Sequence, residues 1–313
     1  MNKIIRLIAA VVLAAFAIPS LAQSWPQRPV KFILPLGPGA GADIGARLFA
    51  DQLARRWGQP VVVENRPGGD GIIAINAVIA ARDDHTLLWG PSSTFVGHPY
   101  TLDKLPYDPA ELVPVARVTN TVVTIAVPAS LNVGSLKELM ALARAQPGKL
   151  NFASVTTVTD IIFAGYFKSA GLDVQKISYK DTVTALNDLV EGRIHMYGAA
   201  YAIVRAQAQS GRIKLLAVTN RGRVRGLDLP TVAEAGFPEL NFDGLVGLIA
   251  ARSSGISDAA RERIAADPVV SERLVATAQV NSPGTGAELA ASIDEQAANL
   301  AATAKILGLK PKF

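Results

Sequence analysis

The chain contains no cysteine and few charged side chains, and each shortage excludes a class of protein. Because cysteine is absent from all 313 residues, we exclude a disulfide scaffold, a thiolate metal site, a cysteine nucleophile and a lipid-modified N-terminal cysteine. Charged residues make up 18% of the chain and hydrophobic residues 50%. A composition with this much apolar surface to bury excludes an intrinsically disordered protein.

Catalytic motifs are also missing. The histidines His85, His98 and His195 are scattered, with no second histidine at metal-ligand spacing, so we expect each to be a turn or surface residue. The chain has no Walker motif, no Gly-x-Ser-x-Gly elbow and no close acidic pair suited to acid–base chemistry. We therefore predict a binding protein rather than an enzyme, with no cofactor and no metal.

The N-terminus has the pattern of a secretory signal peptide. Lys3 and Arg6 precede the apolar run Leu7–Ile18, and small residues follow, so we predict cleavage after Ala22. The whole chain has a net charge of +5, and loss of these two cations leaves 5 − 2 = +3. This excess is too weak for a nucleic-acid-binding surface. We expect a monomer in the periplasm that binds no nucleic acid.

Strand-like apolar segments alternate with helical patterns along the mature chain. After the strand Val30–Leu34, a helix carries Phe49, Leu53 and Trp57 at a spacing of four residues, and Gly58 ends it. Such alternation predicts mostly parallel sheets flanked by helices, which is the α/β class. A second complete alternating series begins near residue 122, and only helices are expected after residue 251.

Two alternating series imply two lobes between which the chain crosses twice. We expect the crossings, and the hinge, at the apolar strands Val122–Val127 and Leu245–Ala251. The predicted boundaries are a leader at 1–22, lobe 1 at 23–122, lobe 2 at 123–245, and a return of 246–313 to lobe 1. A ligand is expected in the cleft between the lobes, at the carboxyl ends of the parallel strands.

A glycine-rich loop between the first strand and the first helix is the first candidate binding segment. Glycines allow the backbone to approach a ligand closely, and the N–H groups at a helix start favour anions. For Asp43 we favour a structural role in the first helical turn over a ligand contact. The candidate residues of this loop are Leu36, Gly37, Gly39, Ala40, Gly41, Ala42 and Asp43.

A hydroxyl-rich loop in the second series has the same strand-to-helix position. Its serines and threonines either cap the helix or contact the ligand, and we leave both roles open. Two such loops that face each other across a cleft would present two sets of N–H donors, which suits dicarboxylates. The candidates here are Ser154, Thr156, Thr157, Thr159 and Asp160, together with Ser92 and Ser93 after a strand of the first lobe.

Two other functions remain open. Gly37, Gly39 and Ala42 match a dinucleotide fingerprint, and Glu64 ends the next strand, where a ribose-binding acid would stand. A single match of this kind is weak evidence, and no nicotinamide pool is expected outside the cytoplasm. The alternatives are therefore a dinucleotide-dependent enzyme that uses the Gly37–Ala42 loop and a ligand-sensing subunit for a membrane signalling protein.

Several segments together resemble one protein family. The most specific are Glu64–Gly68 and Pro230–Gly236, and the others are Trp25–Val30, Pro35–Arg47, Ser178–Lys180, Ala185–Gly192 and Leu216–Thr219. Over essentially the whole mature chain they are similar to the Bug-type extracytoplasmic solute receptors, which are the substrate-binding proteins of tripartite tricarboxylate transporters. The resemblance implies a two-lobed periplasmic binding protein of type II, or Venus flytrap, that captures a small organic acid for the membrane subunits of a transporter.

The resemblance also implies which loops bind the ligand. Members of this family hold a ligand carboxylate with backbone N–H groups and ordered water from two loops, which correspond to Leu36–Asp43 and Ser154–Asp160 here. The sequence departs from the family pattern at Ala40, Asp160, Asp181 and His195. From these departures we hypothesise that Asp160 and Asp181 favour a ligand that carries an amine, and Asp181 is a further candidate site residue.

Overall fold

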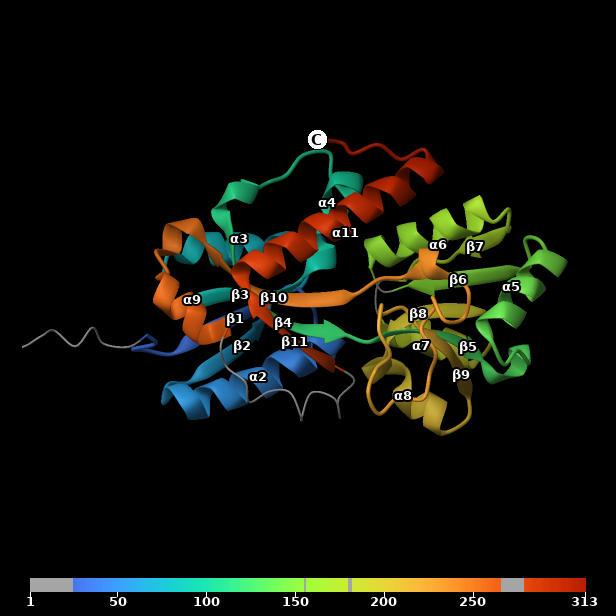
Figure 1. The fold of residues 1–313 in the computed structure, drawn as a ribbon, viewed down its shortest axis with the longest axis horizontal. Helices are drawn as coiled ribbons and strands as arrows, with labels where there is room; N and C mark the ends of the chain where they lie inside the picture. The colour runs from blue at the N-terminus through green and yellow to red at the C-terminus, as the bar shows by residue number, and fades with distance from the viewer. Residues whose placement is uncertain (1–24, 155, 180–181, 266–278) are drawn as a thin grey trace, which may run out of the picture.

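The computed structural model describes residues 25–154, 156–179, 182–265 and 279–313. The predicted signal peptide and Asp181 therefore lie outside the described residues. The chain forms two α/β lobes that lie side by side, each built on one sheet with helices around it (Figure 1). No described helix is long and apolar enough to cross a membrane.

The first lobe contains a six-stranded sheet in the order β11-β4-β10-β3-β1-β2. β1 pairs in parallel with β2 and β3, whereas β10, β4 and β11 add antiparallel pairs. The strands are β1 (Val30–Leu34), β2 (Val61–Asn65), β3 (Thr86–Pro91), β4 (Leu112–Thr121), β10 (Gly244–Ala251) and β11 (Gln279–Thr285). The helices are α2 (Gly41–Trp57), α3 (Ile72–Ala81), α4 (Ser92–Thr101) and α9 (Asp258–Ala265).

The second lobe contains a five-stranded sheet in the order β7-β6-β8-β5-β9. β6 pairs in parallel with β7 and β8, and β5 pairs antiparallel with β8 and β9. The strands are β5 (Val123–Pro128), β6 (Leu150–Ser154), β7 (Val174–Lys176), β8 (Met196–Ala200) and β9 (Ile213–Val218). The helices are α5 (Leu136–Ala145), α6 (Thr157–Ser169), α7 (Thr182–Val190) and α8 (Tyr201–Gln209).

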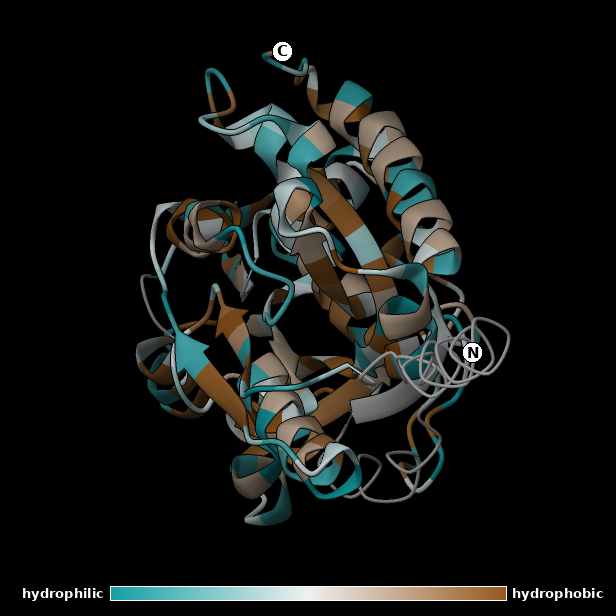
Figure 2. Cartoon of the chain, turned by 90° about the vertical axis from the view of Figure 1, so that its left-hand side faces the viewer, coloured by the Kyte–Doolittle hydropathy of each residue, from teal (hydrophilic) through white to brown (hydrophobic). Residues whose placement is uncertain are grey.

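Each lobe has its own hydrophobic core. In the first, Phe49, Leu53 and Trp57 lie on the buried face of α2, as their spacing predicts, and pack with Phe32 and Trp89 of the sheet. In the second, a corresponding cluster forms around Phe152, Phe163 and Phe167. Figure 2 shows the apolar strands enclosed by helices of mixed polarity. The strand–helix alternation of the sequence thus predicts these layers correctly.

The chain crosses between the lobes at Val122 and again in the segment 219–243, which leads from β9 to β10. The prediction of a crossing within Leu245–Ala251 is wrong, because these residues pair with β3 and β4 inside the first sheet. Their continuous apolar character reflects burial on both faces of a central strand.

Two more elements differ from the sequence-based expectation. β11 (Gln279–Thr285) forms at the edge of the first sheet, although only helices were expected after residue 251. Its sequence holds proline and glycine, lacks a clear apolar alternation, and gains its pairing from β4 rather than from local preference. The helix α4 (Ser92–Thr101) was also missed, because its glycine and proline weaken the helical pattern.

Polar bonds join the two crossing segments. The Asn120 side-chain amide donates to a carboxylate oxygen of Asp243 at 2.8 Å, and the Asn220 amide donates to the Asn120 side-chain oxygen at 3.0 Å. The Thr219 N–H donates to the carbonyl of Val123 at 2.9 Å. The outgoing and returning chains are thus held together where the lobes meet.

The last helix, α11 (Gly286–Leu307), packs against both lobes (Figure 1). Near its start, Leu289 lies in a core cluster of the first lobe, while Leu300 and Ala304 lie in the core of the second. Gly165 on α6 allows this close approach, because a Cβ there would collide with the Thr303 methyl group. α11 therefore spans the two lobes rather than covering the first alone.

We predict that Gly198→Ala destabilises the second lobe. A Cβ on Gly198 in β8 would collide with the buried ring of Phe163, and overpacking of this kind costs about 1–3 kcal/mol. Gly222→Ala is the matched control, because nothing lies within 4 Å of the added carbon. Urea denaturation should show the loss for Gly198→Ala only, and equal stability of both variants would contradict this packing.

Candidate functional site

The glycine-rich loop between β1 and α2 is held by a buried carboxylate. Asp43 is only 3% exposed, and one of its oxygens accepts hydrogen bonds from the Gly39 N–H at 2.9 Å and from Arg47 at 3.1 Å. The other oxygen accepts from the Asn65 amide at 2.8 Å. Asn65 also donates to the Leu36 carbonyl at 2.9 Å. Asp43 thus fixes the backbone of the loop that it follows.

The surroundings of Asp43 also set its ionisation. Burial alone would raise the pKa of this carboxyl, but the hydrogen bonds from Arg47, Gly39 and Asn65 and the charge of Arg47 hold it below its ordinary value of 3.8. Asp43 is therefore ionised at neutral pH and already paired within the protein. Its charge does not project toward a ligand.

Two more loops of the first lobe meet this loop at the carboxyl ends of β1 and β3. Gly71 has a φ of +90°, and a Cβ on it would lie 3.3 Å from Pro35 and still closer to the Thr94 methyl group. Only glycine fits there, so the loops after β1, β2 and β3 converge at this point. The loop around Gly71 was not predicted as part of the site, although its Pro-Gly-Gly-Asp-Gly sequence signals a special turn.

A buried histidine supports the loop after β2. His98 is completely buried, and its Nε2 lies 2.8 Å from the carbonyl oxygen of Asp70, so Nε2 carries the proton and donates. The Tyr107 hydroxyl then donates to Nδ1 at 2.8 Å. Burial raises the pKa of Tyr107 to about 12, with a further contribution from the charge of Asp70. The tyrosine therefore stays protonated and keeps this bond.

The expectation that every histidine lies in a turn or on the surface is wrong for His98, which is completely buried within α4. His85 does lie in the turn before β3, although it is buried there. His98 and His85 are buried because both ring nitrogens of each find hydrogen-bond partners, which offsets the loss of water. His195 is partly buried against Asn151, and desolvation lowers its pKa.

The serines after β3 are turned toward the interior. Ser92 donates its hydroxyl proton to the side-chain oxygen of Gln296 on α11, and Gln296 donates in turn to the Asp243 carbonyl at 2.6 Å. Ser93 is also buried. Ser92 therefore links the start of α4 to α11 and to the returning crossing segment.

The hydroxyl-rich loop of the second lobe forms a closed network of its own. Thr156 caps α6 by accepting the Thr159 N–H at 3.2 Å, and the Thr159 hydroxyl donates to Ser154 at 2.8 Å. Ser154 donates to Asp160 at 2.7 Å, and Asp160 forms an ion pair with Lys176. Asp160 is therefore already paired within the protein, which counts against the Asp160 part of the amine-ligand hypothesis, and that part stays a prediction.

The first turn of α6 lies next to the first lobe. A Cβ on Gly97 of α4 would be 3.8 Å from Thr157 and 3.6 Å from Val158. α2 also contacts α8 of the second lobe. In Figure 1, α2 (blue) and α6 (yellow-green) each begin on the side of their lobe that faces the other lobe. The structure thus brings the two predicted loops to the junction between the lobes.

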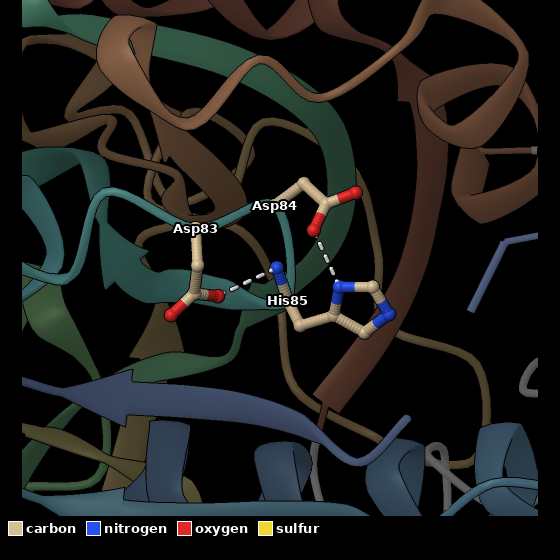
Figure 3. A group of neighbouring side chains, drawn as sticks. All are labelled: Asp83, Asp84 and His85. Carbon is tan, nitrogen blue, oxygen red and sulfur yellow. Dashed lines mark hydrogen bonds and ion pairs between the residues drawn. The ribbon is translucent and has the colours of Figure 1, made fainter. Parts of the chain in front are cut away.

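The side chains of Asp83, Asp84 and His85 lie close enough together to hold a metal ion, but each of them is bonded to another group of the protein (Figure 3). The Nε2 of His85 accepts the Gln27 N–H at 3.2 Å, so Nδ1 carries the proton and donates to Asp84 at 2.6 Å. The Arg28 guanidinium lies 3.5 Å from each carboxylate. The cluster therefore fastens the beginning of the described chain to the turn before β3.

Comparison with known proteins identifies the family. The sequence model of the family described as tripartite tricarboxylate transporter family receptor matches residues 45–260. The chain belongs to this family. It is 30% identical to a UPF0065 protein of Bordetella bronchiseptica, over 97% of this chain and 93% of that protein. It is 32% identical to the protein BugT of Bordetella pertussis, over 72% and 71% of the two chains.

A solved structure supports the same assignment. A Rhodopseudomonas palustris protein determined with adipate is 26% identical and superposes with a TM-score of 0.81, over 92% of this chain and all of that one. The two-lobed architecture of periplasmic binding proteins and the Bug-type resemblance are both confirmed. The receptor family is one of solute-binding proteins.

We predict that Asp43→Asn destabilises the receptor at neutral pH but not in acid. The folded pKa of Asp43 lies below the unfolded one, so its contribution is complete above the unfolded pKa and is lost as the pH falls through the folded pKa. The expected loss at pH 7 is about 1–3 kcal/mol. Asp51→Asn on the same helix is the control, because its ion pair with Arg55 is exposed and contributes little. Urea denaturation at several pH values measures the difference, and a loss that does not depend on pH would contradict this role.

Proposed function

We propose that this receptor captures a small carboxylate between its two lobes in the periplasm and presents it to the membrane subunits of a tripartite tricarboxylate-type transporter. The R. palustris protein determined with adipate, a dicarboxylate, supports this ligand class. The signal-peptide pattern before Ala22 supports export. The proposed role is binding rather than catalysis, with no cofactor.

One observation carries the proposal: the starts of α2 and α6 lie at the junction between the lobes, each directly after a parallel strand. A helix start presents backbone N–H groups and the positive end of the helix dipole, which together favour an anion. Two such starts on opposite sides suit a molecule with a carboxylate at one end or at both. The proposed contacts come from 36–43 in the first lobe and 154–160 in the second.

Closure of the lobes would convert binding into a signal for the transporter. The ligand contacts both lobes only in the closed form, so it shifts the population toward that form. The hinge of this motion is proposed at Val122 and in the segment 219–243, where the chain passes between the sheets. Sensing for a membrane signalling protein would use the same motion and differs only in the partner.

The ion pair of Glu64 counts against a dinucleotide at this site. Glu64, the residue in the position of a ribose-binding acid, is paired with Arg66 at 2.6 Å. This carboxylate is therefore already engaged within the protein.

We predict that dicarboxylates raise the melting temperature of the mature protein. A ligand that binds only the native state stabilises it, by about 2.7 kcal/mol at a hundredfold excess over Kd. Adipate should give a larger shift than 6-aminohexanoate, because Asp160 is already neutralised by Lys176. A thermal-shift series with both compounds is the measurement. A larger shift with the amino acid would restore the amine hypothesis and count against this proposal.

We predict that Gly39→Ala weakens carboxylate binding about tenfold, a loss of about 1.4 kcal/mol. The added methyl group stands on the loop that the ligand approaches. Gly58→Ala is a closely matched control: both glycines have positive φ, +82° and +67°, and neither has an atom within 4 Å of the added carbon. They lie at opposite ends of α2. Titration calorimetry with adipate should separate them, and an equal Kd for both variants would place the ligand elsewhere.

A further inference from the structure

A cavity of about 510 Å³ lies among α6, α11 and the returning crossing segment 238–243. This volume falls in the range of small-molecule sites. Of its lining residues, Val158 alone falls within the two segments assigned to the carboxylate site, and the rest belong to other parts of the described chain. The proposed function leaves this cavity unused.

One part of the cavity wall is apolar and could hold a hydrocarbon group. Val158 and Ile162 contribute from α6, Leu300 from α11, and Phe242 from the crossing segment. All four are buried. The Gly165–Thr303 contact described above lies in the same wall and brings the two helices together there.

The polar part of the wall includes three carboxylates and an amide oxygen without a partner. Asp243 and Glu295 are both paired with Arg221, with the closer contact, to Glu295, at 2.7 Å. The side-chain oxygen of Asn241 is buried and has no hydrogen-bond partner. Glu239 is exposed at the cavity and forms no ion pair with another described residue. Two acceptors, one of them negatively charged, are thus left for a ligand.

We propose that this cavity is a second ligand site, which takes a small primary amine with an apolar body. An ammonium group supplies the donors that Asn241 and Glu239 lack, and the apolar wall receives the rest of the molecule. A carboxylate would be repelled, because three carboxylates but one guanidinium line the cavity. The amine site differs in place and in charge preference from the carboxylate site between the lobes.

The test uses 2-phenylethylamine as the probe, with 2-phenylethanol and 3-phenylpropanoate as a neutral and an anionic analogue of similar shape. Titration calorimetry on the mature protein should show binding of the amine, at least about tenfold weaker binding of the alcohol, and none of the acid. Saturating adipate should not compete with the amine. Competition, equal binding of the alcohol, or no heat with the amine would overturn the second site.

Variants locate the amine. Glu239→Gln should raise its Kd about three- to fivefold, as for an exposed ion pair. Asn241→Leu should raise it at least about tenfold, while circular dichroism shows an unchanged fold. Glu262→Gln, an exposed change on α9 outside the cavity, should leave the Kd unaltered. Unchanged amine binding in both cavity variants would overturn the proposal, whereas adipate binding by the same variants tests the carboxylate site separately.

Discussion

The N–H groups at the starts of two helices are the feature on which the account of this receptor depends. α2 and α6 each begin directly after a parallel strand, and the fold sets the two starts at the junction of the lobes. The strand orders of the two sheets are similar, so each lobe places the start of one helix at the junction. An anion held there needs no lysine or arginine from the protein.

The charged residues near these loops are neutralised within the protein. Arg47 accompanies Asp43, and Lys176 accompanies Asp160. Buried charges without partners are costly. Because Asp43 and Asp160 are both paired, their carboxylates can lie near an anion site without repelling the anion. In the proposed site the side chains shape the loops, and the ligand contacts are proposed for the backbone. Discrimination among acids would then follow from the length and shape of the space between the lobes.

Strong local patterns in the sequence predict much of the fold, and long-range contacts explain what it does not predict. The stripe Phe49, Leu53 and Trp57 and the stop at Gly58 are local signals, and α2 follows them. β11 and the place of Leu245–Ala251 in the centre of the first sheet depend on pairing with β4, which no local pattern reports. An apolar run indicates burial but does not indicate in which sheet a strand lies.

The candidate site also depends partly on local sequence patterns and partly on long-range contacts. The two loops could be found from glycines and hydroxyls that follow strands, but their internal bonds could not. The partners of Ser92 and His98 are Gln296 and the Asp70 carbonyl, which are distant in sequence, so the support of the first-lobe loops is visible only in three dimensions. The cavity along α11 likewise combines segments from three parts of the chain.

The most direct test of the central claim is a crystal structure of the mature protein with adipate. The account predicts a carboxylate within hydrogen-bond distance of backbone N–H groups in 36–43 or 154–160, with the lobes closed on the ligand. Adipate bound through an arginine or lysine side chain, or seated away from both helix starts, would contradict it.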